Sequence, residues 1–200
     1  VLKMYERVGA AVRDTLRDAR FPLIISGDHS SAGGTIAGIK MAYPESRLGV
    51  IWIDAHADLH SPYTTPSGNM HGMPLATALN EDNIEEKLND LDYETIELWE
   101  MLKSVGDIAP KIEYRDLIYI TLRDYEEQEA ALIKQNKVRV VTTNELRKTG
   151  ITKLCRELIK YLSHCDKIYI SFDVDSMDPS VSRGTGTPVK GVSMREKLPI

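Results

Sequence analysis

Two spacings of apolar residues recur along the chain and predict its secondary structure. Residues 2–19 place apolar side chains three and four positions apart with charged ones between them, which is the period of an amphipathic helix. Residues 48–53 form a continuous apolar run instead, as in a strand buried on both faces. By these criteria we expect helices at residues 2–19, 32–41, 75–79, 81–102, 126–135 and 144–162, and strands at residues 21–25, 48–53, 117–121, 138–141 and 167–172.

The order of these elements predicts the fold class. Helices and strands alternate, and the connections are long enough for parallel crossovers, so we expect an α/β protein with a mostly parallel central sheet. We find no internal repeat or linker, which favours a single domain over residues 1–200. The chain starts at Val1 without a methionine and stops in mid-pattern, so we expect this domain to be incomplete at both ends.

Composition narrows the possible functions. The chain is 42% hydrophobic and 28% charged with a formal net charge of -5, so we expect no nucleic-acid partner. Its apolar runs are too short to span a bilayer, and its first residues do not form a signal peptide. Cys155 and Cys165 form no zinc or disulfide pattern. We therefore expect a cytoplasmic protein with no membrane partner.

Candidate metal ligands follow three of the predicted strands. Because alternate residues of an extended chain point to the same side, the sequence Asp54-Ala55-His56-Ala57-Asp58 is expected to direct three ligands into one cavity. The carboxyl ends of parallel strands lie along one edge of a sheet, so other strand ends add ligands there. The full set is His29, Asp54, His56, Asp58, Asp173 and Asp175. This number of ligands matches a two-metal cluster.

Each of these residues alone has a simpler explanation. A single aspartate at a strand end usually forms a turn or caps a helix. However, four carboxylates brought together repel one another and require either bound cations or protonation. We favour cations, and oxygen with nitrogen ligands suits Mn²⁺, Co²⁺ or Zn²⁺.

Two further segments bear on the site. The loop over residues 60–74 is long, rich in Pro, Ser, Thr and Gly, and contains His71, so we expect it to line the site. Residues 33–40 are rich in glycine, but Lys40 does not have the spacing of a phosphate-binding loop. We attribute these glycines to close packing of a helix on the sheet.

Three motifs resemble the signatures of the ureohydrolases, the arginase and agmatinase family. They are SGDHS at residues 26–30, DAHAD at residues 54–58 and SFDVDSMDP at residues 171–179. The resemblance implies a three-layer α/β/α fold and two Mn²⁺ ions that activate a water to release urea from a guanidinium group. It places one ion on His29, Asp54, Asp58 and Asp173, and the other on Asp54, His56, Asp173 and Asp175.

The same resemblance implies roles in catalysis and substrate binding. Asp58 would pass a proton to the leaving amine, and His71 would shuttle protons. Ser67 and Asn69 would hold the α-carboxylate of arginine, while Glu126 would face the substrate ammonium. Two positions depart from the usual arginase pattern, because arginases commonly have Asn where His60 stands and Asp where Glu126 stands.

These residues lead to one functional prediction and two alternatives. We expect hydrolysis of L-arginine to ornithine and urea by a homo-oligomer, a trimer or hexamer by family resemblance. The first alternative is a ureohydrolase of another small guanidino substrate, such as agmatine or guanidinobutyrate. The second is a metal-binding homologue without catalytic activity.

Overall fold

The computed structural model describes residues 1–190, which fall into two compact units. Unit 1 contains Val1–Leu48 and Asp58–Glu113, and unit 2 contains Gly49–Ala57 and the chain from Tyr114 onward. The chain therefore passes between the units after Leu48, after Ala57 and after Glu113. The second passage divides the DAHAD motif, leaving Asp54 and His56 in unit 2 and Asp58 in unit 1.

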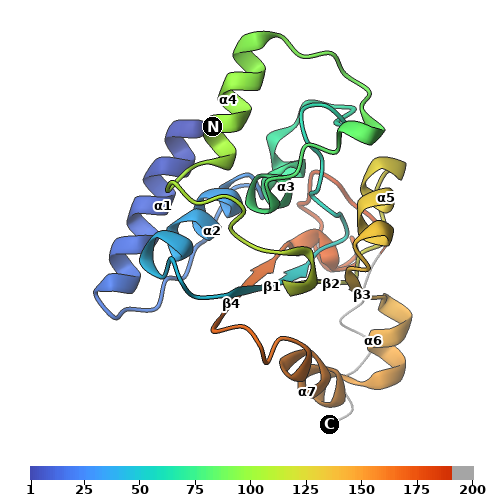
Figure 1. Ribbon diagram of the computed structural model, residues 1–200. Coiled ribbons are helices and arrows are strands. Elements are labelled where there is room, and N and C mark those ends of the chain that lie inside the picture. Colours follow the sequence, from blue (N-terminus) through green and yellow to red (C-terminus); the bar gives the residue numbers. More distant parts are fainter. Residues whose placement is uncertain (191–200) are drawn as a thin grey trace. The chain divides into compact units, whose positions relative to one another are not determined.

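Unit 2 is built on a four-stranded sheet in the order β3-β2-β1-β4 (Figure 1). The strands are β1 (Leu48–Ile53), β2 (Leu117–Ile120), β3 (Arg139–Val141) and β4 (Lys167–Phe172). β1 pairs in parallel with β2, with Trp52 opposite Tyr119, and β2 pairs in parallel with β3. A parallel sheet with connecting helices confirms the predicted α/β class.

Helices on one face of this sheet complete the core of unit 2. They are α6 (Thr143–Thr149) and α7 (Ile151–Tyr161), while α5 (Glu127–Gln135) connects β2 to β3. Every fourth residue of α7 and its continuation faces inward, so Leu154, Leu158 and Leu162 are buried with Ile118 and Val141. Ile51 of β1, the strand that leads into Asp54, packs against the same cluster.

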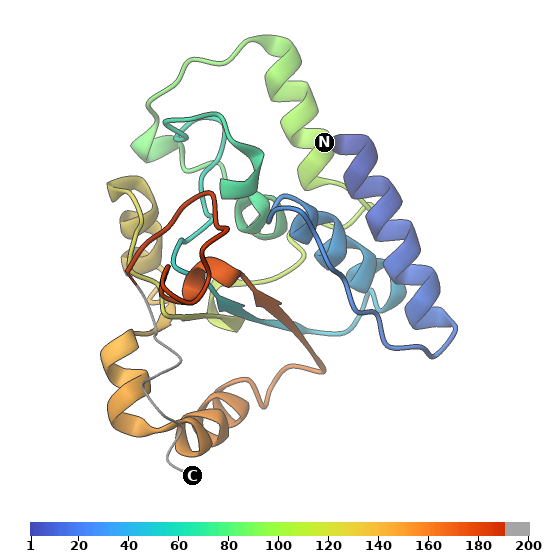
Figure 2. The same ribbon diagram turned by 180° about the vertical axis from the view of Figure 1, so that it is seen from behind.

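Unit 1 is helical. It contains α1 (Leu2–Arg17), α2 (Ser31–Ala42), α3 (Pro74–Leu79) and α4 (Tyr93–Lys103), with short 3-10 turns η1 (Met70–Gly72) and η2 (Ile84–Glu86). α1 lies beside α2 in both ribbon views (Figure 2). The Trp99 indole N–H and the Lys103 ammonium both donate to Asp82 at 2.7 Å, which ties α4 to the loop before it.

The glycines of α2 pack against a helix, so the prediction that they pack on the sheet was wrong. A Cβ on Gly34 would lie 2.9 Å from the Tyr5 Cα, and one on Gly38 would lie 2.5 Å from the Gly9 carbonyl oxygen. Both contacts are with the backbone of α1. Glycine is therefore needed because the two helix backbones approach each other closely.

Gly38→Ala is expected to destabilise the protein by about 2 kcal/mol, measured as the free energy of unfolding in denaturant. The added methyl group meets rigid backbone, and overpacking costs about 1–3 kcal/mol, more than the helix propensity of alanine returns. Gly184→Ala is the matched control, because nothing lies within 4 Å of its Cβ position. A Gly38→Ala variant as stable as the parent protein would contradict the close helix contact.

The predicted strand at residues 21–25 is absent from the structure. Within residues 1–190 this segment belongs to no sheet, and the side chains of Phe21, Leu23 and Ile25 are 89%, 82% and 93% exposed. A strand depends on hydrogen-bonded neighbours as well as on its own apolar residues. The apolar run alone was therefore not sufficient evidence.

Two predicted helices are shorter than expected. In place of a helix over residues 81–102, the chain forms η2 and then α4, whose first turn is capped by the Asp92 carboxylate accepting from the Thr95 N–H at 2.8 Å. Between them, the Asn89 side chain donates to the carbonyls of Pro62 and Thr65. The helix predicted at residues 144–162 is divided at Gly150, whose φ of 77° ends α6.

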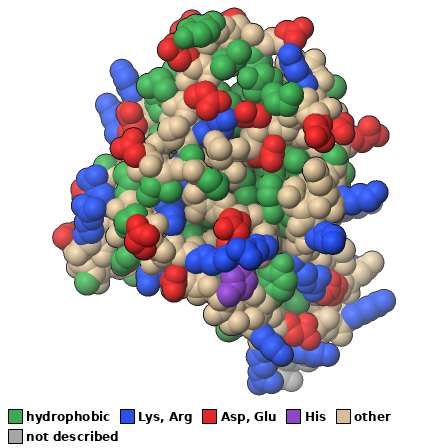
Figure 3. Space-filling model, in the orientation of Figure 1, with side chains coloured by type: hydrophobic (Ala, Val, Ile, Leu, Met, Phe, Trp, Pro, Cys, Tyr) green, Lys and Arg blue, Asp and Glu red, His purple; other side chains and the backbone are tan. Residues whose placement is uncertain are grey.

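The surface shows the mixture of charges expected from the composition. On the face drawn in Figure 3, Lys and Arg side chains are interspersed with Asp and Glu. Over the described part of the chain, no helix is both long and apolar enough to cross a bilayer.

Candidate metal centre

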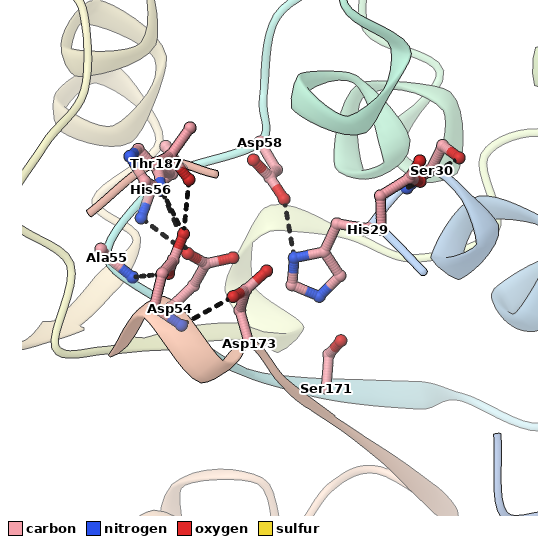
Figure 4. Close-up of polar contacts among 12 residues, drawn as sticks. His29, Ser30, Asp54, Ala55, His56, Asp58, Ser171, Asp173 and Thr187 are labelled. Carbon is pink, nitrogen blue, oxygen red and sulfur yellow. Dashed lines mark hydrogen bonds and ion pairs between the residues drawn. The ribbon is translucent and has the colours of Figure 1, made fainter. Parts of the chain in front are cut away.

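Three candidate ligands meet at the carboxyl ends of the strands of unit 2. The His56 Nδ1 lies 3.0 Å from the Asp175 Oδ2 and 3.5 Å from the Asp54 Oδ1. One ligand atom from each of the three residues falls within 4.8 Å of the others. Asp54 and Asp175 are buried, being 1% and 4% exposed. Figure 4 shows Asp54 and His56 in this group. The arrangement concentrates two carboxylates around one imidazole.

Side-chain hydrogen bonds to the backbone, and not an extended chain, bring these ligands together. The Asp54 Oδ1 accepts the His56 N–H at 2.8 Å, and the Asp173 Oδ1 accepts the Asp175 N–H at 2.8 Å. Both aspartates thus form the turn that follows their own strand. The chain bends at residues 54–56, so the extended course that would alternate Asp54, His56 and Asp58 ends at the strand.

Three donors hold Asp175 in place. The Ala55 N–H donates to its Oδ1 at 3.3 Å, and the Thr187 hydroxyl donates to its Oδ2 at 2.9 Å. Arg123 donates to its backbone carbonyl at 2.8 Å. The sequence analysis assigned no role to Thr187 or Arg123, since each acts only through a neighbour that is remote in sequence. The carboxylate of Asp175 is thereby fixed before any ligand binds.

Thr121 is a third residue to which the sequence analysis assigned no role at the site. It follows β2 with a φ of 71°, a conformation that is rare for a β-branched residue. Its hydroxyl donates to the Asp54 carbonyl at 3.1 Å, and its N–H donates to Val141 at 2.9 Å. Such strain persists only where surrounding contacts enforce it, and it is common at functional sites.

The electrostatics of this group favour a bound cation. Hydrogen bonds with Asp175 and then with Asp54 raise the pKa of His56 to about 10. Without metal, a proton on His56 therefore supplies the positive charge that the two carboxylates need. A divalent ion would supply it instead, and the oxygen and nitrogen donors match Mn²⁺ or a similar ion. The donor set thus fits a metal site.

Unit 1 provides a separate pair of candidate ligands. The His29 Nδ1 lies 3.0 Å from the Asp58 Oδ2, and both side chains are largely buried (Figure 4). Asp58 has a φ of 51°, which aspartate tolerates better than most residues, and its carbonyl accepts the Leu75 N–H. Next to His29 in the sequence, the Ser30 hydroxyl donates a hydrogen bond to the Asp28 carboxylate. This hydrogen bond is the main cause of the lowered pKa of Asp28.

The predicted loop at residues 60–74 is ordered by internal hydrogen bonds. The buried His60 places its Nδ1 3.0 Å from the Thr64 Oγ1, and its N–H donates to Gly72. Ser67 and Asn69 are exposed, and the Asn69 N–H donates to the Ser67 Oγ at 3.2 Å. His71 is half-buried within η1. The proposed substrate contacts of these residues stay predictions.

Glu126 has a structural role in unit 2. It is exposed and caps the amino end of α5, where its carboxylate accepts from the Glu129 backbone and the Glu129 carboxylate accepts its N–H at 3.1 Å. A capping box of this kind satisfies two donors of the first helical turn. Its predicted contact with the substrate ammonium also stays a prediction.

Comparison with known proteins shows the family. The model of the Arginase family matches residues 1–200, and the chain therefore belongs to the arginase family. It is 39% identical over 197 residues to arginase of Bacillus subtilis and 37% identical over 199 residues to human arginase-1. The crystal structure of Bacillus subtilis arginase superposes with a TM-score of 0.82 and covers 98% of this chain.

The chain spans only part of these relatives. Both alignments include 98% of this chain, but they include only 60% of the Bacillus subtilis arginase and 57% of human arginase-1. In the structural comparison it covers 63% of the Bacillus subtilis chain.

Proposed function

We propose that the protein hydrolyses L-arginine to ornithine and urea with two divalent metal ions, preferably Mn²⁺. One ion would be held by His29, Asp54, Asp58 and Asp173, and the other by Asp54, His56, Asp173 and Asp175. The observation that carries this proposal is the group of Asp54, His56 and Asp175. The chain belongs to the arginase family and also contains the remaining residues of the proposed ligand set. When bound, the ions would acidify a shared water and so supply the nucleophile.

The residues of the chain have distinct tasks in this proposal. The carboxylates of Asp54 and Asp173 would offset the charge of the ions, and the hydrogen bonds that they accept from the His56 and Asp175 N–H groups hold these carboxylates in place. Asp58 is paired with His29 at 3.0 Å and would deliver a proton to the leaving amine. His71 would exchange protons with solvent, because imidazole changes its charge near neutral pH.

Substrate choice would depend on groups away from the metals. Ser67 and Asn69 lie exposed in one loop and would donate hydrogen bonds to the α-carboxylate of arginine. His60 and Glu126 would complete the contacts to the amino-acid end of the substrate. Agmatine and guanidinobutyrate each lack part of that end, so these contacts would distinguish the substrates.

The complete protein loaded with Mn²⁺ is expected to release urea from L-arginine about 100-fold more efficiently than from agmatine. A site that hydrogen-bonds a substrate group discriminates against analogues that lack the group. The measurement is kcat/KM for L-arginine, agmatine and guanidinobutyrate. Higher efficiency with either analogue would assign the protein to another ureohydrolase activity, and two bound metals without urea release would indicate a non-catalytic homologue.

A loop variant provides the control for this comparison. Replacing both Ser67 and Asn69 by alanine is expected to raise KM for L-arginine and to leave agmatine turnover unchanged. An equal loss with both substrates would show that the loop does not recognise the α-carboxylate.

Assembly and location remain further predictions. We propose that the complete protein is a trimer or hexamer and is cytoplasmic. The first is testable by light scattering of the purified protein, and the second by fractionation of the source cells.

A further inference from the structure

A second group of potential ligands lies in unit 2, at the other end of β4 from Asp173. It consists of Asp116, His164 and Cys165, which we call the Asp-His-Cys cluster. Asp116 ends the 3-10 turn η3 (Tyr114–Asp116) directly before β2, and His164 with Cys165 lies in the loop between α7 and β4. Asp173 and Asp175 follow β4, whereas His164 and Cys165 precede it.

The three side chains converge on one carboxylate oxygen. The Asp116 Oδ1 lies 2.7 Å from the His164 Nε2 and 3.6 Å from the Cys165 Sγ. Asp116 is 1% exposed, while the side chain of His164 is 41% exposed. Cys165 is partly buried against the core, and its Sγ lies 3.1 Å from the position that a Cβ on Gly49 would occupy. The cluster therefore has a buried base and one side that solvent reaches.

These distances suit a small tetrahedral ion. Two ligand atoms on tetrahedral Zn²⁺ are about 3.5 Å apart, given bonds of roughly 2.0–2.3 Å. The distance of 3.6 Å between the Cys165 Sγ and the Asp116 Oδ1 is already close to that value. The imidazole needs to swing outward by less than about 1 Å, and its exposed side leaves room for this and for a water as fourth ligand.

The chemistry of the donors differs from that of the hydrolytic group. Thiolate is a soft ligand that selects Zn²⁺ over Mn²⁺, whereas carboxylates with imidazole accept Mn²⁺. The chain has two cysteines, and neither belongs to the proposed dimetal ligand set. The Asp-His-Cys cluster would therefore favour Zn²⁺, and the proposed hydrolytic ligands would accept Mn²⁺.

We propose that Asp116, His164 and Cys165 bind one Zn²⁺ ion as a structural site that joins the starts of β2 and β4. Binding displaces the proton from the Cys165 thiol, so affinity rises with pH. The competing explanation is a plain hydrogen bond between His164 and Asp116 beside a small, partly buried cysteine. That explanation predicts no bond between metal and sulfur.

Titration of the metal-free complete protein with Co²⁺ tests the proposal without using enzyme activity. Cobalt bound to thiolate gives an intense charge-transfer absorption that oxygen and nitrogen ligands do not give. We expect the final intensity of this band to correspond to one thiolate-bound Co²⁺ per chain, whatever other Co²⁺ the protein binds, and the band to disappear on addition of Zn²⁺. Because the proposed hydrolytic ligands contain no sulfur, success or failure here is independent of the proposed function.

Variants identify the ligands. Cys165→Ser is expected to abolish the band, whereas Cys155→Ser is the matched control and keeps it, since Cys155 is exposed on α7. His164→Asn, at a partly exposed position, is expected to weaken Co²⁺ binding at this site by at least about 10-fold. The absence of a thiolate band in the parent protein, or a band that persists in Cys165→Ser, would overturn the proposal.

Discussion

Replacing Asp54 by asparagine is expected to lower the bound Mn²⁺ from two ions to at most one per chain and to reduce urea release by more than about 100-fold. Asparagine keeps an oxygen that can accept the His56 N–H, so the turn after β1 survives while the negative charge is lost. Loss of an outer hydrogen-bond partner of a metal ligand already costs about 10–100-fold, and Asp54 is proposed to contact both ions directly.

Metal analysis and steady-state assays of the complete protein measure this effect. Asp90→Asn is the control for loss of a carboxylate, because the side chain of Asp90 is 98% exposed and forms an ion pair with Lys87 at 2.7 Å. It should leave metal content and activity unchanged. If Asp54→Asn retained both ions and most of its activity, Asp54 would not bridge them.

Replacing His71 by asparagine should have the second largest effect, a fall in kcat of about 10²–10⁴-fold, which is the usual contribution of a general acid or base. The asparagine side chain is polar and of similar size, but it does not exchange protons near neutral pH. Both metal ions are expected to remain, because His71 belongs to neither proposed ligand set.

Addition of free imidazole provides the decisive control for His71. If His71 shuttles protons, the His71→Asn variant is expected to regain part of its kcat as the imidazole concentration rises, while KM stays constant. Loss of metal from His71→Asn would instead show that the residue supports the loop at residues 60–74. Unchanged kcat would remove His71 from the mechanism.

Strands with strong local signals were predictable from the sequence. Residues 48–53 and 167–172 form β1 and β4 as predicted, and β2 differs from its prediction by one residue. Residues 21–25 have a similar apolar pattern but form no strand, because pairing depends on neighbours that a local pattern does not contain. The positions of helix ends likewise depended on single residues, such as the left-handed Gly150.

Residues that gather at the candidate site could be singled out from the sequence, but their local geometry could not. Asp54, His56 and Asp175 were singled out by residue type and by their positions after strands, and they lie together in unit 2. The turns that orient them, the hydroxyl of Thr187 on Asp175 and the strained backbone of Thr121 depend on contacts across 12 to 67 positions of sequence or on local φ values. Spacing along a strand does not encode such contacts.

The central claim is that one pair of metal ions is bound by His29, Asp54, His56, Asp58, Asp173 and Asp175. Crystals of the complete protein grown with Mn²⁺ would test it by anomalous scattering at the manganese edge. We predict two peaks, about 3.5–4 Å apart, with both ions touching Asp54 and Asp173. One ion must also touch His29 and Asp58, and the other His56 and Asp175. A single peak, or two peaks that share no carboxylate, would contradict the account.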